Sequence, residues 1–267
     1  MIKKSVNCLL IALLFFTSSY SFGQKKKLDV NFSADVMSRY VWRGTQFGGN
    51  SPSLQPSMSV TYEGFEFGAW GAYSLSGANS GQELDLYVSY TLPNELFSLT
   101  LTDYYFPNET EDYKYFEYNN NRTGHVMEGM LSFNGTEKIP FGLTFALNFW
   151  GADAVKLGDD PSKADFNTKT GLQYSSYLEL TYSHNLDNNI TLDAFIGASL
   201  NNAKEANTST GFIGESGYYG SKAGVVNLGC KLSKEVAINE KLTFPVSASL
   251  ITNPVDEKIY FVLGLSF

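Results

Sequence analysis

The last ten residues of the chain, Lys258 to Phe267, read KIYFVLGLSF. Side chains of two kinds alternate along this stretch with a period of two. One face carries only apolar side chains, those of Phe261, Leu263, Leu265 and Phe267. The other face is mixed and holds Tyr260, Val262, Gly264 and Ser266. The pattern predicts a β-strand with two different faces and an aromatic residue at the end of its apolar face.

A terminal strand of this kind resembles the assembly signal of bacterial outer-membrane β-barrels, which closes the barrel and ends in phenylalanine. The resemblance implies that Phe261, Leu263, Leu265 and Phe267 form that signal and that the barrel-assembly machinery is a partner. Earlier segments should then be neighbouring strands of similar length, each with one face toward lipid and the other toward the lumen.

The rest of the chain meets this requirement. Alternating segments recur along its whole length, separated by turn residues. We expect strands at 28–43, 54–62, 65–75, 84–92, 97–102, 125–133, 141–150, 174–182, 190–200, 226–233, 242–250 and 258–267. The sequence therefore predicts an all-β protein, a single antiparallel transmembrane barrel of about twelve strands.

The connections between these segments fall into two alternating classes. Short turns are expected near residues 63, 93, 136, 186 and 236, and mostly longer loops near residues 48, 78, 115, 161, 211 and 254. An outer-membrane barrel has short periplasmic turns and longer extracellular loops, and an even number of strands places both termini on the periplasmic side. A soluble β-sandwich gives no reason for such alternation.

Residues 1–24 read as an export signal. Lys3 and Lys4 precede an apolar core from Cys8 to Phe16, and Ser21-Phe22-Gly23 provides a small-residue exit. We expect residues 25–267 to form one outer-membrane barrel domain. The apolar core is too short for a transmembrane helix, and no later run approaches the roughly 18 apolar residues that such a helix needs. A helical membrane protein is thus excluded.

Composition narrows the function further. Charged residues make up 17% of the chain and aromatic residues 15%, and the net charge is −8 with a pI near 4.8. A nucleic-acid-binding protein would present a clustered basic face, which this sequence lacks. Beyond the predicted signal, Cys230 is the only cysteine, so an intrachain disulfide or a cysteine metal cluster is excluded. We expect no cofactor and no metal site.

Aromatic residues cluster near the predicted strand ends, as in the two girdles at the lipid headgroup level. The outer girdle would hold Tyr40, Trp42, Tyr73, Tyr105, Phe149 and Tyr174. The inner girdle would hold Tyr62, Phe65, Tyr90, Phe97, Phe141, Tyr182 and Phe267. The competing interpretation is sugar stacking, which is favoured most at the loop residues Tyr113, Tyr115, Tyr118, Tyr218 and Tyr219.

The segment Ser38-Arg39-Tyr40-Val41-Trp42-Arg43-Gly44 is followed by Leu54-Gln55-Pro56 and Gly68-Ala69-Trp70. This series resembles the opening of the TorF-like putative porins of Gram-negative bacteria, which carry a similar serine, aromatic and arginine-glycine run. The resemblance covers about residues 30 to 105. It implies an outer-membrane barrel but no particular solute, because the substrate of that family is poorly defined.

If the apolar faces meet lipid, charged residues face the lumen. We predict that the pore is lined by Asp35, Arg39, Arg43, Glu66, Trp70, Glu83, Asp85, Glu128, Glu179, Asp193 and Lys231. Buried charges require either water or paired networks, so the lumen is either a pore or plugged. We favour a narrow, cation-leaning channel for passive diffusion of small hydrophilic solutes. Its other partners would be outer-membrane lipid and lipopolysaccharide.

Two other classes of function stay open. The first is a structural or surface-recognition barrel without an open pore, since loops on a rigid scaffold often carry recognition. The second is an outer-membrane hydrolase, in which only His125 and His184 could serve as histidine bases. No G-x-S-x-G motif accompanies either histidine, and we expect both to be solvated turn or rim residues. The acidic loops lack calcium-loop spacing. We therefore predict that the protein is not an enzyme.

Overall fold

A computed structural model describes residues 28–76, 82–107, 114–120, 122–239 and 242–267. The predicted export signal, residues 1–24, lies outside this part of the chain. None of the described helices is long and apolar enough to cross a membrane.

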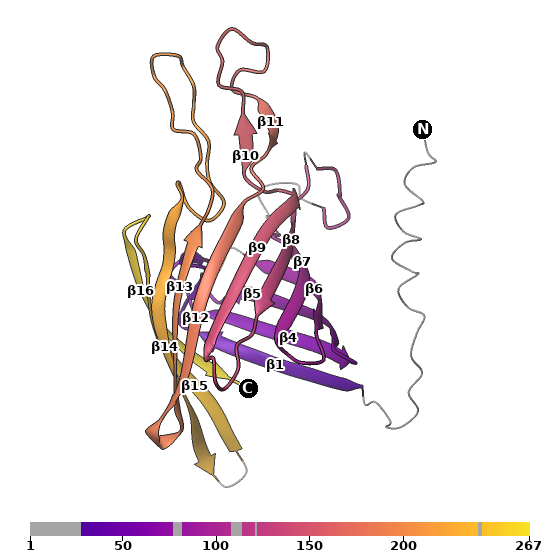
Figure 1. Ribbon diagram of the computed structural model, residues 1–267, viewed down its shortest axis with the longest axis vertical. Helices are drawn as coiled ribbons and strands as arrows, with labels where there is room; N and C mark the ends of the chain where they lie inside the picture. Colours follow the sequence, from indigo (N-terminus) through magenta and orange to yellow (C-terminus); the bar gives the residue numbers. More distant parts are fainter. Residues whose placement is uncertain (1–27, 77–81, 108–113, 121, 240–241) are drawn as a thin grey trace.

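Twelve strands pair side by side into one closed antiparallel barrel (Figure 1). In chain order they are β1 (Asp29–Met37), β4 (Ser53–Tyr62), β5 (Phe65–Ser74), β6 (Glu83–Thr91), β7 (Phe97–Tyr105), β8 (His125–Phe133), β9 (Phe141–Gly151), β12 (Ser176–Leu186), β13 (Ile190–Ser199), β14 (Gly224–Asn239), β15 (Leu242–Asn253) and β16 (Lys258–Ser266). The remaining elements are the hairpin β2 (Tyr40–Trp42) and β3 (Thr45–Phe47), the hairpin β10 (Val155–Leu157) and β11 (Lys169–Leu172), and a 3₁₀ turn η2 (Asp187–Asn189). The predicted twelve-stranded barrel is confirmed.

The terminal strand closes the barrel against β1. Asp35 pairs with Ser266, Val36 with Leu265 and Met37 with Gly264. The amide of Phe267 donates a further hydrogen bond of 3.0 Å to the carbonyl oxygen of Ala34. Closure satisfies the backbone groups that an open sheet edge would expose, and a barrel needs this in lipid, where no water replaces the missing partners.

The faces of the barrel are distributed as the alternation predicts, with apolar side chains outside. Exposed positions on the barrel wall include Phe32, Phe67, Leu86, Leu99, Leu131, Phe145, Leu180, Leu232, Leu250, Phe261 and Leu263. Buried polar or charged positions on the inward face include Gln55, Ser59, Glu83, Asp85, Glu128, Asn148, Asn227 and Ser249. This distribution is the reverse of that in a soluble protein, which buries its apolar face, and it is the one expected of a barrel surrounded by lipid.

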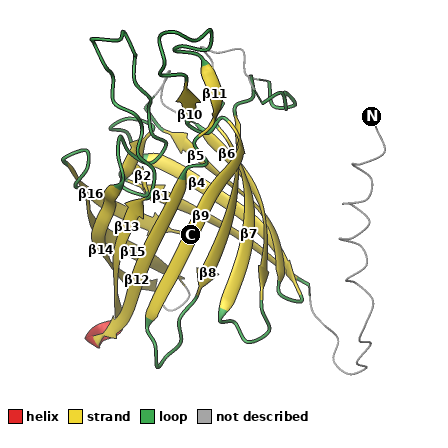
Figure 2. Ribbon diagram, turned by 45° about the horizontal axis from the view of Figure 1, so that its top comes forward, coloured by secondary structure: helices red, strands yellow, loops and turns green. Residues whose placement is uncertain are grey.

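The two classes of connection lie at opposite ends of the barrel. Figure 1 shows β10, β11 and the loop after β13 extending from one end, while the turn after β12 lies at the other. The turn of β4 into β5 takes only Glu63 and Gly64, both with positive φ. Figure 2 shows β2 near the end that carries the long loops.

The prediction of one strand over 28–43 is wrong. β1 ends at Met37, and the chain bends at Ser38 and Arg39 before β2 begins. Arg43 has a φ of 47° and Gly44 a φ of 75°, which turns β2 back into β3. A short hairpin strand alternates as a long barrel strand does, so periodicity could not separate the two.

The predicted outer girdle needs the same correction. Tyr40 and Tyr105 are buried, and Trp42 packs against Tyr104 and Tyr219 instead of facing lipid. Tyr40 and Trp42 belong to the inward hairpin, and Tyr105 is covered by Tyr115 of the loop after β7. Tyr73 and Phe149 are exposed as predicted.

Candidate channel constriction and lumen cavity

The hairpin of β2 and β3 crosses the interior of the barrel. The backbone of Gly44 lies so close to β14 that a Cβ atom there would be 1.8 Å from the carbonyl oxygen of Val226. The side-chain amide of Asn253, on β15, donates a hydrogen bond of 3.2 Å to the carbonyl oxygen of Gly44. The hairpin leaves the wall between β1 and β4. Its tip therefore rests on the β14–β15 wall.

Arg43, at the tip of this hairpin, is bound to Glu128 of β8. The two side chains form a two-point ion pair, with Nη1 on one carboxylate oxygen and Nη2 3.1 Å from the other. The Glu128 side chain is fully buried and that of Arg43 is 10% exposed. A planar guanidinium matches a carboxylate at two points and keeps its proton, so the pair supports both charges out of water.

Tyrosines complete the surroundings of the pair. Tyr104 donates a hydrogen bond of 2.9 Å to Glu128, and Tyr219 donates one of 2.7 Å to the other carboxylate oxygen. Tyr219 also accepts a hydrogen bond of 2.8 Å from Arg43. The Arg43 guanidinium lies 4.6 Å from the ring centre of Tyr177. Residues from the hairpin, β7, β8, β12 and the loop after β13 thus converge on one point.

This point is continuous with a packed apolar cluster inside the barrel. Ala146, Tyr177, Tyr219 and Val226 are fully or almost fully buried, and Trp42 packs against them. We call this cluster, together with the hairpin 40–47 and the pair Arg43–Glu128, the plug. Buried side chains therefore occupy the half of the lumen next to the long loops, which we call the outer half.

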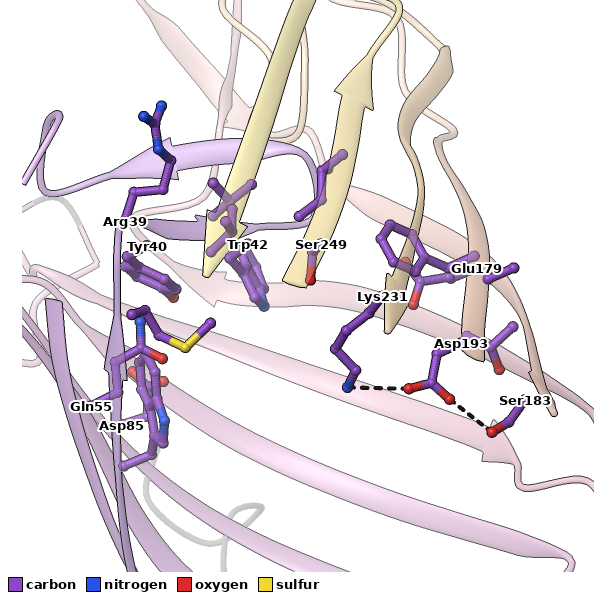
Figure 3. A pocket seen from close by; sticks show the side chains of 18 of the residues that line it. Arg39, Tyr40, Trp42, Gln55, Asp85, Glu179, Ser183, Asp193, Lys231 and Ser249 are labelled. Atoms are coloured by element: carbon purple, nitrogen blue, oxygen red, sulfur yellow. Dashed lines mark hydrogen bonds and ion pairs between the residues drawn. The ribbon is translucent and has the colours of Figure 1, made fainter. Parts of the chain in front are cut away.

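Beside the plug, toward the short turns, the lumen holds a cavity of about 760 Å³. Its lining combines side chains of the hairpin with both walls of the barrel, as Figure 3 shows. At the far end of β1, residues 29–33 are exposed, and they pair with β4 but not with β16.

The structure places the predicted pore-lining residues in three groups. Arg43 and Glu128 form the centre of the plug. The cavity is lined by Arg39, Trp70, Asp85, Glu179, Asp193 and Lys231. The remaining three, Asp35, Glu66 and Glu83, do not line the cavity, and only Glu83 contacts the plug, through Tyr40 of the hairpin. Glu66 accepts a hydrogen bond of 2.8 Å from Tyr87, and Glu83 interacts with Tyr40 and Asp85. Their role in conduction stays a prediction.

Sequence reasoning missed Tyr104, Tyr177 and Tyr219 as parts of the site. Tyr219 was considered only as a loop residue for sugar stacking, yet it is buried with its hydroxyl on Glu128. One signal was available in the sequence. Tyr104 and Tyr177 alternate in phase with the inward-facing residues of their strands, so the pattern places their aromatic rings among polar groups in the lumen.

The expectation of a solvated His125 is wrong. The ring lies on the face of the barrel wall that points away from the lumen, and it is fully buried between Tyr105, Tyr115 and Tyr118. Its Nδ1 lies 2.8 Å from Asp103, and its Nε2 lies 2.6 Å from the carbonyl oxygen of Tyr115. A carbonyl oxygen can only accept, so Nε2 carries a hydrogen and is not free to act as a base.

Comparison with solved structures gives three distant matches. A structure described as "KdgM porin" is 9% identical, covers 88% of this chain and 97% of its own, and has a TM-score of 0.45. The COG4313 outer membrane channel from Pseudomonas putida F1 is 12% identical, covers 93% and 98%, and has a TM-score of 0.38. A Salmonella typhi OmpF complex with daunomycin is 7% identical, covers 91% and 97%, and has a TM-score of 0.36. The barrel assignment therefore rests on the strand pairing described above.

No curated protein matches the chain. A family model described as "Bacterial protein of unknown function (Gcw_chp)" matches residues 24–213, which is more than half of the 267 residues. The matched range includes the segment on which the TorF-like resemblance rests, and that label stays a prediction. The chain belongs to the Gcw_chp family of bacterial proteins.

Proposed function

We propose that this protein is an outer-membrane, porin-like channel through which small hydrophilic solutes diffuse passively. The observation that carries the proposal is the inverted barrel, apolar outside and polar inside, with a cavity of about 760 Å³ in its lumen. Side chains fill a barrel of eight strands, whereas sixteen strands leave an open channel. Twelve strands lie between these limits, so one inward hairpin suffices to narrow the passage.

The channel is proposed to favour cations. Arg43 is neutralised by Glu128, so the outer half contributes no net charge from this pair. The other predicted pore-lining acids are Asp35, Glu66, Glu83, Asp85, Glu179 and Asp193, against Arg39 and Lys231. Six carboxylates against two cations produce a negative potential, which concentrates cations in a narrow lumen.

The proposed location is the outer membrane, with lipid and lipopolysaccharide around the barrel. Supporting features are the export signal expected from the sequence, the apolar exterior and the terminal strand that closes the barrel. Phe261, Leu263 and Phe267 are exposed on the outer face, where the barrel-assembly machinery could contact them.

Planar-bilayer recording with the purified, refolded protein tests the proposal. We expect small ohmic steps with a reversal potential that favours cations. Glu83→Gln with Asp85→Asn should weaken that preference, because both carboxylates are on the inward face of β6. The matched control is Asp159→Asn with Asp160→Asn, two acids of an exposed loop. Membranes that stay silent with folded protein would contradict a channel.

A second candidate is a surface-recognition barrel without an open pore. Two observations favour it: the plug occupies the outer half of the lumen, and hydrogen bonds join two long loops outside the barrel. Glu215 accepts hydrogen bonds from the amides of Leu157 and Lys204, and Asn167 accepts one from the amide of Ile213. Silent membranes in the recording described above would support this candidate.

A further inference from the structure

We propose that the lumen cavity is a binding site for a small neutral saccharide. The inference deepens the proposed channel and rests on it for the route by which the solute reaches the site. It concerns the cavity toward the short turns, which the hairpin of the plug borders, and it names a substrate class that charge selectivity alone would not indicate.

One wall of the cavity is aromatic. It presents Tyr40, Trp42, Trp70, Tyr87 and Tyr104, from β2, β5, β6 and β7. The ring centres of Tyr40 and Trp70 lie 5.4 Å apart, and those of Trp42 and Tyr104 lie 5.5 Å apart. These four rings are thereby held in pairs, and the hydroxyl of Tyr87 is held by Glu66, so little side-chain entropy is lost when a ligand stacks on the wall.

The opposite wall is polar and hydrogen-bonded within itself. Lys231 lies 3.3 Å from Asp193, and Ser183 donates a hydrogen bond of 2.7 Å to the same carboxylate. Figure 3 shows this group across the cavity from Tyr40 and Asp85. The ammonium of Lys231 has further donors, and the hydroxyl of Ser249 on the same side both donates and accepts. These groups can exchange hydrogen bonds with hydroxyls at several positions.

A pyranose ring satisfies both walls at once. Its C–H face is apolar and can stack on an aromatic ring, while the hydroxyls on its rim both donate and accept. The cavity volume of about 760 Å³ lies within the roughly 300–1,000 Å³ typical of small-molecule sites. Sites of this type pair an apolar surface with a few polar groups that fix the orientation of the ligand.

Although the predicted pore-lining residues together carry a net negative charge, the charges around the cavity itself are nearly balanced. Its lining holds Asp85, Glu179 and Asp193 against Arg39 and Lys231, a difference of one. Asp193 is paired with Lys231, and Glu179 accepts hydrogen bonds from Tyr177 and Asn227. An ion would therefore meet an almost balanced field, whereas a neutral polyhydroxy ring needs no net charge.

Isothermal titration calorimetry with maltose as the probe tests the site on full-length, folded protein in detergent. We expect saturable binding, and Trp70→Leu should weaken it at least about tenfold because the variant loses a stacking ring. A tenfold loss corresponds to about 1.4 kcal/mol of binding free energy. The matched control is Trp150→Leu: this tryptophan contacts Tyr118 of the loop after β7 and does not line the cavity. Asp193→Asn should also weaken binding, because it replaces one acceptor oxygen of the polar wall by an amide donor.

The outcomes separate this inference from the channel itself. Maltose binding that is unchanged in folded Trp70→Leu protein overturns the site, as does the absence of binding to the wild-type protein. Binding of tetramethylammonium in place of maltose also overturns it and makes the cavity a cation site. Maltose binding without conductance supports the saccharide site and contradicts the channel. Conductance without maltose binding supports the channel and contradicts the saccharide site. Folding of each variant is checked by heat-modifiable gel mobility.

Discussion

The two halves of the lumen stabilise their charged side chains in different ways. In the outer half, the charges of Arg43 and Glu128 are buried, and each is satisfied by a fixed partner. In the inner half, the pair Lys231–Asp193 faces the cavity, and its side chains are 45% and 31% exposed. In the inner half solvent also stabilises the two charges, whereas in the outer half protein groups alone stabilise them. For these two pairs, a charge enclosed in the plug is satisfied by protein groups alone, whereas a charge on the cavity is also exposed to solvent.

The largest stability effect is expected at Glu128. Glu128→Ala leaves the guanidinium of Arg43 buried without its carboxylate, and breaking a buried ion pair in this way costs about 3–5 kcal/mol. Urea unfolding followed by tryptophan fluorescence measures it. Glu137→Ala, in an exposed turn, is the control and should change little. If the double variant Arg43→Met with Glu128→Leu is as stable as the wild-type protein, the ion pair fixes the position of the hairpin and adds little to the free energy of unfolding. An equal loss of stability in Glu128→Ala and in the control would contradict the plug.

A smaller loss is expected at the hairpin tip. Gly44→Ala places a Cβ 1.8 Å from the backbone oxygen of Val226, so the hairpin must move away from β14 at a cost of about 1–3 kcal/mol. Gly49→Ala is a matched control, because Gly49 also has positive φ (69°) but nothing lies within 4 Å of the added atom. Unfolding midpoints of the two variants should differ; coincident midpoints would show that the hairpin does not rest on β14.

The inner pair should matter less to stability. Asp193→Ala removes the partner of Lys231, but both side chains are partly exposed, so solvent screening limits the loss to about 0–1 kcal/mol. The same urea titration measures it, with Asp193→Asn as the conservative comparison. A loss as large as that of Glu128→Ala would erase the distinction between a wet and a packed half.

The smallest effect is expected outside the barrel, at Lys204. Its ammonium donates a hydrogen bond of 2.7 Å to Asp159 and holds the pKa of that carboxyl below its ordinary value. A lowered pKa in the folded state means that the contact stabilises above the unfolded value of about 3.9 and is lost as pH falls through the lowered one. Lys204→Ala should speed hydrogen exchange in 155–158 at neutral pH, less so in acid, without moving the unfolding midpoint of the barrel.

Much of the wall could be predicted from sequence, because alternation and turn residues are local. The faces follow from period two alone, as Leu131 outside and Glu128 inside illustrate. The plug could not be predicted, because Arg43 and Glu128 are 85 residues apart and nothing local links them. The nearest signal was WRGTQFGG at 42–49, where glycines follow two short alternating runs, as in a hairpin. Tyr219 was missed because its loop position does not show that it turns inward.

The most direct test of the central claim is single-channel conductance after the hairpin is removed. A variant with residues 39–48 replaced by a short Gly-Ser linker keeps β1 and β4 but lacks Arg43 and the ring of Trp42. If the plug limits passage, its unitary conductance should exceed that of the wild-type protein several-fold, with Arg122→Ala unchanged as a control. Equal conductance in wild-type and hairpin-deleted protein, both shown to be folded, would contradict the account.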